Sequence, residues 1–137
     1  MEGCVFCRIL DGDLPAEIVL DEGPVVGFLD HRPLFPGHVL VVPRGHHETL
    51  ADLPAELVEP LFAQVQRLSR IVPEVLGATG AFVANNNIVS QSVPHLHVHV
   101  VPRRFKDGLR GFFWPRVDYD DDDHRREVAD RLREAIG

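Results

Sequence analysis

Five short stretches of the chain are rich in Val, Ile, Leu and Phe and are bounded by Pro, Gly, Asp or Asn. Apolar runs of this length between turn-forming residues are typical of β-strands. The chain shows no internal repeat. The pattern therefore predicts five strands, over Glu17–Leu20, Val25–Leu29, His38–Val42, Ala81–Ala84 and His95–Val101.

Between the third and fourth predicted strands, apolar residues recur every three or four positions from Leu57 to Val75. This spacing predicts the main helix, with Asp52 as a candidate cap. We expect a break or kink near Pro73, because a proline inside a helix lacks the amide donor and crowds the preceding turn. A second helix is predicted from about Asp122 to Ile136, with carboxylates at its amino end.

Clustered strands with few helices predict an α+β fold, with an antiparallel five-stranded sheet, one main helix and a C-terminal helix. A doubly wound parallel sheet would need more crossover helices. A chain of 137 residues fits a single domain, and we expect one over residues 1–137.

The composition is that of an ordinary globular protein, with 45% hydrophobic residues and a formal net charge of −7. Proteins that bind nucleic acid in bulk rely on clustered Lys and Arg, so we expect no such partner. The apolar runs are short, and the amino terminus lacks a basic region followed by an apolar stretch. We therefore expect a cytoplasmic protein without a membrane span.

One region departs from the acidic average. Five basic residues are followed by an acidic run over residues 118–123. A basic loop near a phosphate site and a solvated loop balanced by the acidic tail both fit this pattern. The basic residues are Arg103, Arg104, Lys106, Arg110 and Arg116.

Three histidines alternate with apolar residues in the last predicted strand. Because neighbouring side chains of a strand point to opposite faces, His95, His97 and His99 are expected on one face. Such a row fits a nucleophilic imidazole, and it also fits a metal centre of three imidazoles with an open position. Residues 85–94, just before the row, favour the nucleophile, because their amides and hydroxyls can donate to phosphate oxygens.

The segment from His95 to Val101 resembles the His-x-His-x-His-apolar-apolar signature of the histidine triad (HIT) family, and Gln91-Ser92-Val93 matches too. The resemblance covers about residues 3–116, and it leaves the acidic segment and C-terminal helix of residues 117–137 outside. It implies the HIT-like fold. Other blocks similar to the family are residues 4–9, 28–30 and 36–43.

The resemblance implies a hydrolase or transferase acting at the α-phosphate of adenosine-type nucleotides. His97 would attack the phosphorus and form a nucleotidyl-histidine, which water then resolves. His38, His95 and His99 complete the implied catalytic set. The implied substrate-binding residues are Asp30 for the ribose, Asn85 and Gln91 for phosphate oxygens, Ser92 for the leaving group, and Phe6, Ile9, Phe28 and Leu29 for the base. Taken alone, Asp30 also fits a turn cap, and Phe6, Ile9 and Phe28 also fit a core.

Cys4 and Cys7 have the two-residue spacing of half a zinc site, and two buried thiols without metal also fit. The resemblance implies that Cys4, Cys7, His46 and His95 bind a structural zinc, with His47 as the alternative to His46. No cofactor is expected for the chemical step.

The family includes nucleoside phosphoramidases and dinucleoside polyphosphate hydrolases, and the sequence leaves both open. Two alternatives from other classes are a nucleotide-sensing or scaffold protein with little turnover, and a metal-dependent hydrolase using all three imidazoles of the row. Relatives form homodimers in which the sheet continues across the subunits, and we expect the same here.

Overall fold

The computed structural model describes residues 1, 3–110 and 116–137. Its contacts group residues 1–107 and 108–137 into two compact units. The first unit contains a five-stranded sheet of order β1-β2-β3-β5-β4, in which every neighbouring pair is antiparallel. The predicted sheet is thus confirmed, with strands β1 (Ile18–Glu22), β2 (Val25–Leu29), β3 (Val39–Pro43), β4 (Gly80–Ala84) and β5 (Val98–Arg103).

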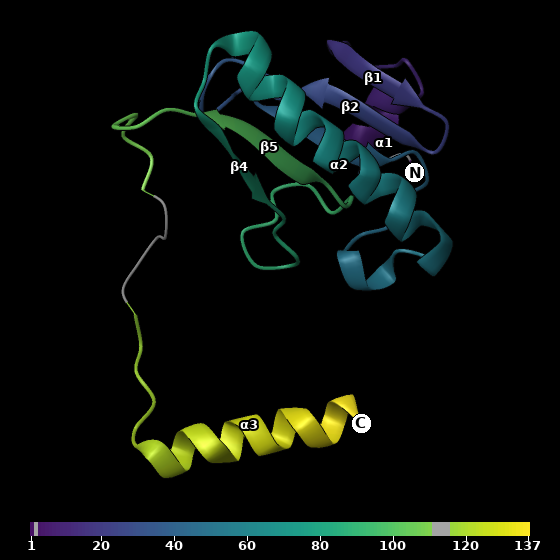
Figure 1. Ribbon diagram of the computed structural model, residues 1–137. Helices are drawn as coiled ribbons and strands as arrows, with labels where there is room; N and C mark the ends of the chain where they lie inside the picture. The colour runs from purple at the N-terminus through teal and green to yellow at the C-terminus, as the bar shows by residue number, and fades with distance from the viewer. Residues whose placement is uncertain (2, 111–115) are drawn as a thin grey trace. The chain divides into compact units, whose positions relative to one another are not determined.

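The main helix, α2 (Ala55–Leu76), lies across one face of this sheet (Figure 1). Its apolar face contributes Leu61, Val65, Leu68 and Val72 to a buried cluster. Removing these side chains from water is the main favourable term for packing the helix on the sheet. From the sheet, the cluster takes Leu20, Val25, Val39, Val41, Val98 and Val100.

Both ends of α2 differ from expectation. Asp52 does not cap α2; its carboxylate accepts from the backbone amide and hydroxyl of Thr49 and caps a short 3-10 turn before the helix. The helix continues through Pro73, whose ring is buried, and ends at Leu76. The predicted break is therefore wrong, since burial of the ring compensates for the missing amide donor. Gly77 ends the helix with φ 65°, and the Ala78 amide donates to the Pro73 carbonyl at 2.8 Å.

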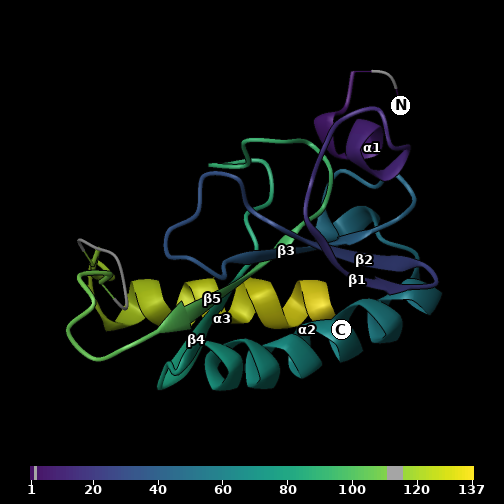
Figure 2. The ribbon, with the colours of Figure 1, turned by 90° about the horizontal axis from the view of Figure 1, so that it is seen from above.

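A short helix that the sequence analysis missed, α1 (Val5–Leu10), covers the opposite face of the sheet from α2 (Figure 2). Six residues are too few to show helical periodicity. The Cys4 thiol caps this helix by accepting from the Cys7 amide at 3.3 Å. Under the helix is a second buried cluster, formed by Cys4, Phe6, Cys7, Val26, Phe28, Leu40 and Val42.

The histidine row begins before its strand does. β5 starts at Val98 rather than His95, because the Leu96 amide donates to the carbonyl of His47, a loop residue, at 2.7 Å. The alternation is nevertheless preserved. Leu96 and Val98 are buried in the cluster under α2, while His97 and His99 line a cavity on the face that α1 covers.

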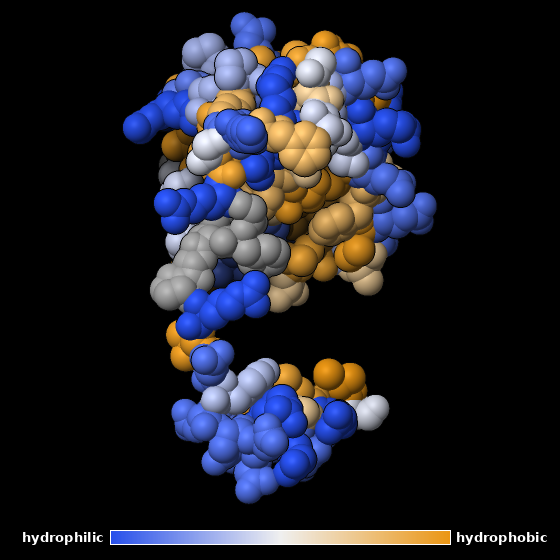
Figure 3. All heavy atoms as spheres, turned by 60° about the vertical axis from the view of Figure 1, so that its left-hand side comes forward, coloured by the Kyte–Doolittle hydropathy of each residue, from blue (hydrophilic) through white to orange (hydrophobic). Residues whose placement is uncertain are grey.

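The second unit contains the predicted C-terminal helix, α3 (Asp122–Ile136). Asp121 caps it by accepting from the His124 amide at 2.7 Å. The surface of α3 is mostly hydrophilic (Figure 3), and ion pairs such as Arg125 with Asp122 connect successive turns. Among the helices of the described residues, none has both the length and the apolarity needed to cross a membrane.

Candidate active site

A cavity of about 510 Å³ lies on the face of the sheet that carries α1. This volume is typical of sites for small molecules. α1 and β2 supply apolar walls, and the segments around His97 supply polar groups. Eight of the predicted site residues line it: Phe6, Ile9, Phe28, Leu29, Asp30, Ser92, His97 and His99.

His97 is held in one tautomer. Its Nδ1 lies 2.7 Å from the carbonyl oxygen of His95, and a carbonyl only accepts, so Nδ1 carries the proton. Nε2 therefore has the free lone pair. The ring lines the cavity and packs edge-to-face on Phe6, with centroids 5.0 Å apart. This is the arrangement that a nucleophilic imidazole requires.

A chain of two hydrogen bonds fixes the tautomers of His38 and His99. The Leu34 amide donates to Nδ1 of His38 at 3.1 Å, so the proton of His38 is on Nε2. That Nε2–H donates to Nδ1 of His99 at 2.9 Å. His99 consequently carries its own proton on Nε2. His99 lines the cavity and His38 lies behind it.

Burial keeps both rings uncharged at neutral pH. Desolvation, helped by the neighbouring His97 and His38 and opposed by the Asp30 carboxylate, lowers the pKa of His99 to about 4. Desolvation also lowers the pKa of His38, although the Asp30 carboxylate opposes this shift. His38 and His99 therefore act as uncharged hydrogen-bonding groups.

Asp30 both stabilises the turn after β2 and lines the cavity. Its Oδ1 accepts from the Arg32 amide at 2.9 Å, as in an Asx-turn, and its Oδ2 lies 3.8 Å from Nδ1 of His38. The same side chain lines the cavity.

Asn85 and Gln91 lie outside the cavity lining, although the sequence analysis assigned them to phosphate oxygens. Asn85 donates to the carbonyl oxygen of His97 at 2.9 Å. Gln91 donates to the Glu48 carbonyl at 2.6 Å and accepts from the Ile88 amide at 2.8 Å. Both amides thus hold backbone in place around the histidine row.

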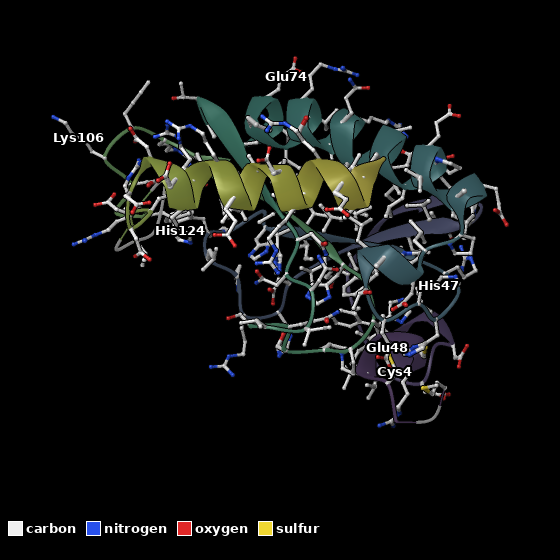
Figure 4. The ribbon with its side chains drawn as sticks, turned by 90° about the horizontal axis from the view of Figure 1, so that it is seen from below. Cys4, His47, Glu48, Glu74, Lys106 and His124 are labelled. Atoms are coloured by element: carbon white, nitrogen blue, oxygen red, sulfur yellow. The ribbon has the colours of Figure 1, made fainter. Side chains whose placement is uncertain are left out.

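Cys4, Cys7, His46 and His95 bring four ligand atoms within 4.8 Å of one another. Figure 4 shows Cys4 beside the segment that carries His47 and Glu48. Nδ1 of His46 lies 3.3 Å from the Cys7 sulfur, and Nδ1 of His95 lies 3.5 Å from both sulfurs. Tetrahedral zinc with ordinary bond lengths places sulfur and nitrogen ligands about 3.5 Å apart. The cluster therefore fits a closed tetrahedral zinc site.

His95 differs in placement from the other two histidines of the row. Its Nε2 lies 2.9 Å from the Pro43 carbonyl oxygen, so Nε2 carries the proton and the Nδ1 lone pair faces the thiols. Both ring nitrogens are thus engaged away from the cavity. Among the described residues, neither cluster of possible metal ligands combines all three imidazoles of the row, so the alternative metal centre is not formed.

Among the lining residues that sequence reasoning missed are two polar ones, Glu17 and His31. Only the pairing of β1 with β2 brings them together, since the Leu29 amide donates to the Glu17 carbonyl at 3.0 Å. It also missed the backbone groups of Leu34 and Pro43 that fix the histidine tautomers, because every residue type supplies such groups.

The HIT domain family model matches residues 11–106. The chain belongs to the HIT family. A HIT relative, "Protein hit" of Bacillus subtilis, is 35% identical over 82% of this chain and 79% of its own length. The adenosine 5′-monophosphoramidase of Candida albicans is 28% identical over 97% of this chain and 91% of its own length. The adenylylsulfatase of Arabidopsis thaliana is 31% identical, over 77% of this chain and 55% of its own.

Solved HIT structures confirm the fold. A HIT family member from Bacillus subtilis superposes with a TM-score of 0.85 at 30% identity, covering 96% of this chain and 95% of that one. A zinc-bound histidine triad family protein from Mycobacterium smegmatis superposes with a TM-score of 0.75 at 38% identity, covering 98% of both chains. The antiparallel sheet with its helices is therefore the HIT fold.

Proposed function

We propose that this HIT protein is a nucleotide hydrolase that cleaves at the α-phosphate through a covalent intermediate on His97. The observation that carries the proposal is the Nε2 lone pair of His97 at the cavity wall, left free by the 2.7 Å bond from Nδ1 to the His95 carbonyl. Two relatives named for phosphoramidase and adenylylsulfatase activity support the same class of reaction.

In the first step, Nε2 of His97 forms a bond to the α-phosphorus as the bond to the leaving group breaks. The imidazole becomes positively charged, and its Nδ1–H bond to the His95 carbonyl stabilises that charge. Ser92 is in the cavity wall, and we assign it to hydrogen-bond the leaving group. In the second step, water forms a bond to phosphorus as the P–Nε2 bond breaks. The electron pair returns to Nε2, a proton of the water is lost to solvent, and the mononucleotide is released.

The cavity provides a place for each part of a nucleotide. We assign the base to the apolar slot of Phe6, Ile9, Phe28 and Leu29, and the ribose hydroxyls to Asp30. The Nε2–H of His99 is the donor for a phosphate oxygen, because its Nδ1 already accepts from His38.

The charges around the cavity favour a phosphoramidate over a dinucleoside polyphosphate. Among the described residues, its lining includes the acidic Glu17 and Asp30 but no Lys or Arg. Arg103 is engaged by Asp107 at 2.6 Å, and Arg104 by the Leu76 carbonyl at 2.5 Å. Neutral imidazoles suit a phosphate carrying one charge, whereas a polyphosphate chain needs cations.

We also propose that Cys4, Cys7, His46 and His95 hold a structural zinc, which leaves His97 free for chemistry. The fit of the four ligand atoms to a tetrahedron and the zinc-bound relative support this assignment. Two buried free thiols suit the reducing cytoplasm, where we place the protein.

We further propose a homodimer formed through the sheet edge at β4. This strand has a neighbour on one side only, and its Val83 is partly exposed. An unpaired strand edge is a ready template for a second copy. Light scattering at the mass of one chain would contradict this proposal.

The test of function uses adenosine 5′-phosphoramidate and a dinucleoside polyphosphate as substrates. Wild type should hydrolyse the phosphoramidate faster and give an adenylylated peptide containing His97 after an acid-free quench and mass spectrometry. His97→Ala should lose at least about 10³-fold in kcat. His124→Ala, on α3, is the matched control and should behave as wild type. Equal rates for wild type and His97→Ala would exclude the nucleophile, and binding without turnover by wild type would favour a sensor.

A further inference from the structure

α1 forms one wall of the cavity, and it depends on tertiary contacts for its stability. A helix of six residues has too few hydrogen bonds to be stable alone. It is held by Cys4 and Cys7 at the metal cluster and by the contact of Phe6 with Phe28, whose ring centroids are 5.3 Å apart. From this helix Phe6 and Ile9 face the cavity.

His95 joins the metal cluster to the proposed nucleophile through a single residue. Its ring nitrogen lies 3.5 Å from both thiols, and its backbone carbonyl accepts the Nδ1–H of His97 at 2.7 Å. Phe6 contacts both rings, with centroid distances of 5.9 Å to His95 and 5.0 Å to His97. A shift of the cluster would therefore move His97 through two contacts, with the His95 carbonyl and with the Phe6 ring.

We propose that the Cys4–Cys7–His46–His95 cluster is a positioning element for the active site: when it holds metal, it fixes the His97 tautomer through the His95 carbonyl and holds Phe6 against the cavity. The catalytic role of this positioning element rests on the proposed function. Loss of the metal would leave the His95 ring held on one side only, by the Pro43 carbonyl, and would release α1 from the sheet, so that the cavity loses a wall while the core under α2 remains intact.

The first test compares metal-loaded and metal-free protein using AMP as the probe. His46→Gln removes a ligand, and His47→Gln changes the adjacent histidine, which lies outside the cluster, as the matched control. We expect His46→Gln to lose zinc by elemental analysis and to bind AMP about tenfold more weakly in calorimetry. His47→Gln should keep both. Wild type stripped of metal by a chelator should lose affinity for AMP and regain it when zinc is added. Addition of zinc should not restore the AMP affinity of His46→Gln.

Hydrogen exchange and NMR measure the same coupling without turnover. In metal-free protein, amides of residues 5–10 should exchange faster, and the ring ¹⁵N signals of His97 should show a mixture of the two neutral tautomers. Val65→Ala, which destabilises the cluster under α2, controls for general loss of stability and should change neither readout. In turnover, Phe6→Leu should keep zinc and raise KM more than it lowers kcat.

Unchanged AMP affinity and an unchanged His97 tautomer in zinc-free protein would overturn the coupling. An equal effect of Val65→Ala, at a matched loss of stability, would also overturn it. If wild type hydrolyses no phosphoramidate, the proposed function fails. The exchange and tautomer measurements would then still decide whether the metal cluster positions His97.

Discussion

Nε2 of His38 donates a hydrogen bond to Nδ1 of His99 over 2.9 Å. The bond has one direction only, because the Leu34 amide occupies Nδ1 of His38. As a result, the His99 proton is on Nε2, available to a phosphate oxygen. A pair of imidazoles 61 residues apart in sequence thus presents a donor to the cavity without carrying charge.

The directional pair predicts that His38 acts through its donor. His38→Leu removes the donor and should lower kcat/KM for a phosphoramidate by about 10²-fold, since His99 can then adopt the other tautomer. His38→Gln keeps an amide donor and should retain more activity than His38→Leu. Steady-state kinetics of both variants checks this, and equal losses would mean that the donor is not what matters.

Burial of His99 predicts an acid-sensitive fold. The pKa of His99 is lowered to about 4 in the folded protein, from about 6.5 in an unfolded chain. Between these values the unfolded state binds more protons, so the free energy of unfolding should fall as pH decreases from 6.5 towards 4. His99→Gln does not titrate, and urea unfolding should show a shallower pH dependence for it. Parallel curves for the two proteins would contradict the prediction.

Asn85 is predicted to affect rate rather than binding. Its amide holds the carbonyl of His97 at 2.9 Å and lies outside the cavity lining. Asn85→Ala should therefore lower kcat for a phosphoramidate by about tenfold while leaving AMP affinity within twofold of wild type. Calorimetry with AMP beside steady-state kinetics separates the two effects. A large loss of AMP affinity would instead support the phosphate contact expected from sequence.

Gly37 is predicted to be irreplaceable in the turn before β3. Its φ is +99°, and a Cβ there would meet the Leu76 side chain at the end of α2. Gly37→Ala should destabilise the fold by about 1–3 kcal/mol, mainly from backbone strain at the positive φ, with a smaller part from displacing the Leu76 methyl group. Gly12→Ala is the control, because Gly12 also has a positive φ but open space around it. Urea denaturation should show a clearly smaller loss for Gly12→Ala.

Local patterns accounted for much of the architecture. The apolar runs located all five strands, and the spacing from Leu57 to Val75 located α2. The alternation of residues 95–99 correctly separated the core-facing Leu96 and Val98 from the cavity-facing His97 and His99. These features follow from the sequence because side-chain periodicity is a property of neighbouring residues.

Tertiary structure alone decided what each histidine can do. The tautomer of His97 is set by a carbonyl two residues away, but that of His95 is set by Pro43, 52 residues away, and that of His99 by His38. α1 also escaped prediction, since it is held by Cys4 and Cys7 against residues about 90 positions later. The chemistry of a histidine depends on which backbone and side-chain groups contact its two ring nitrogens. Folding brings those groups together from distant strands and loops, and no local sequence pattern predicts the contacts.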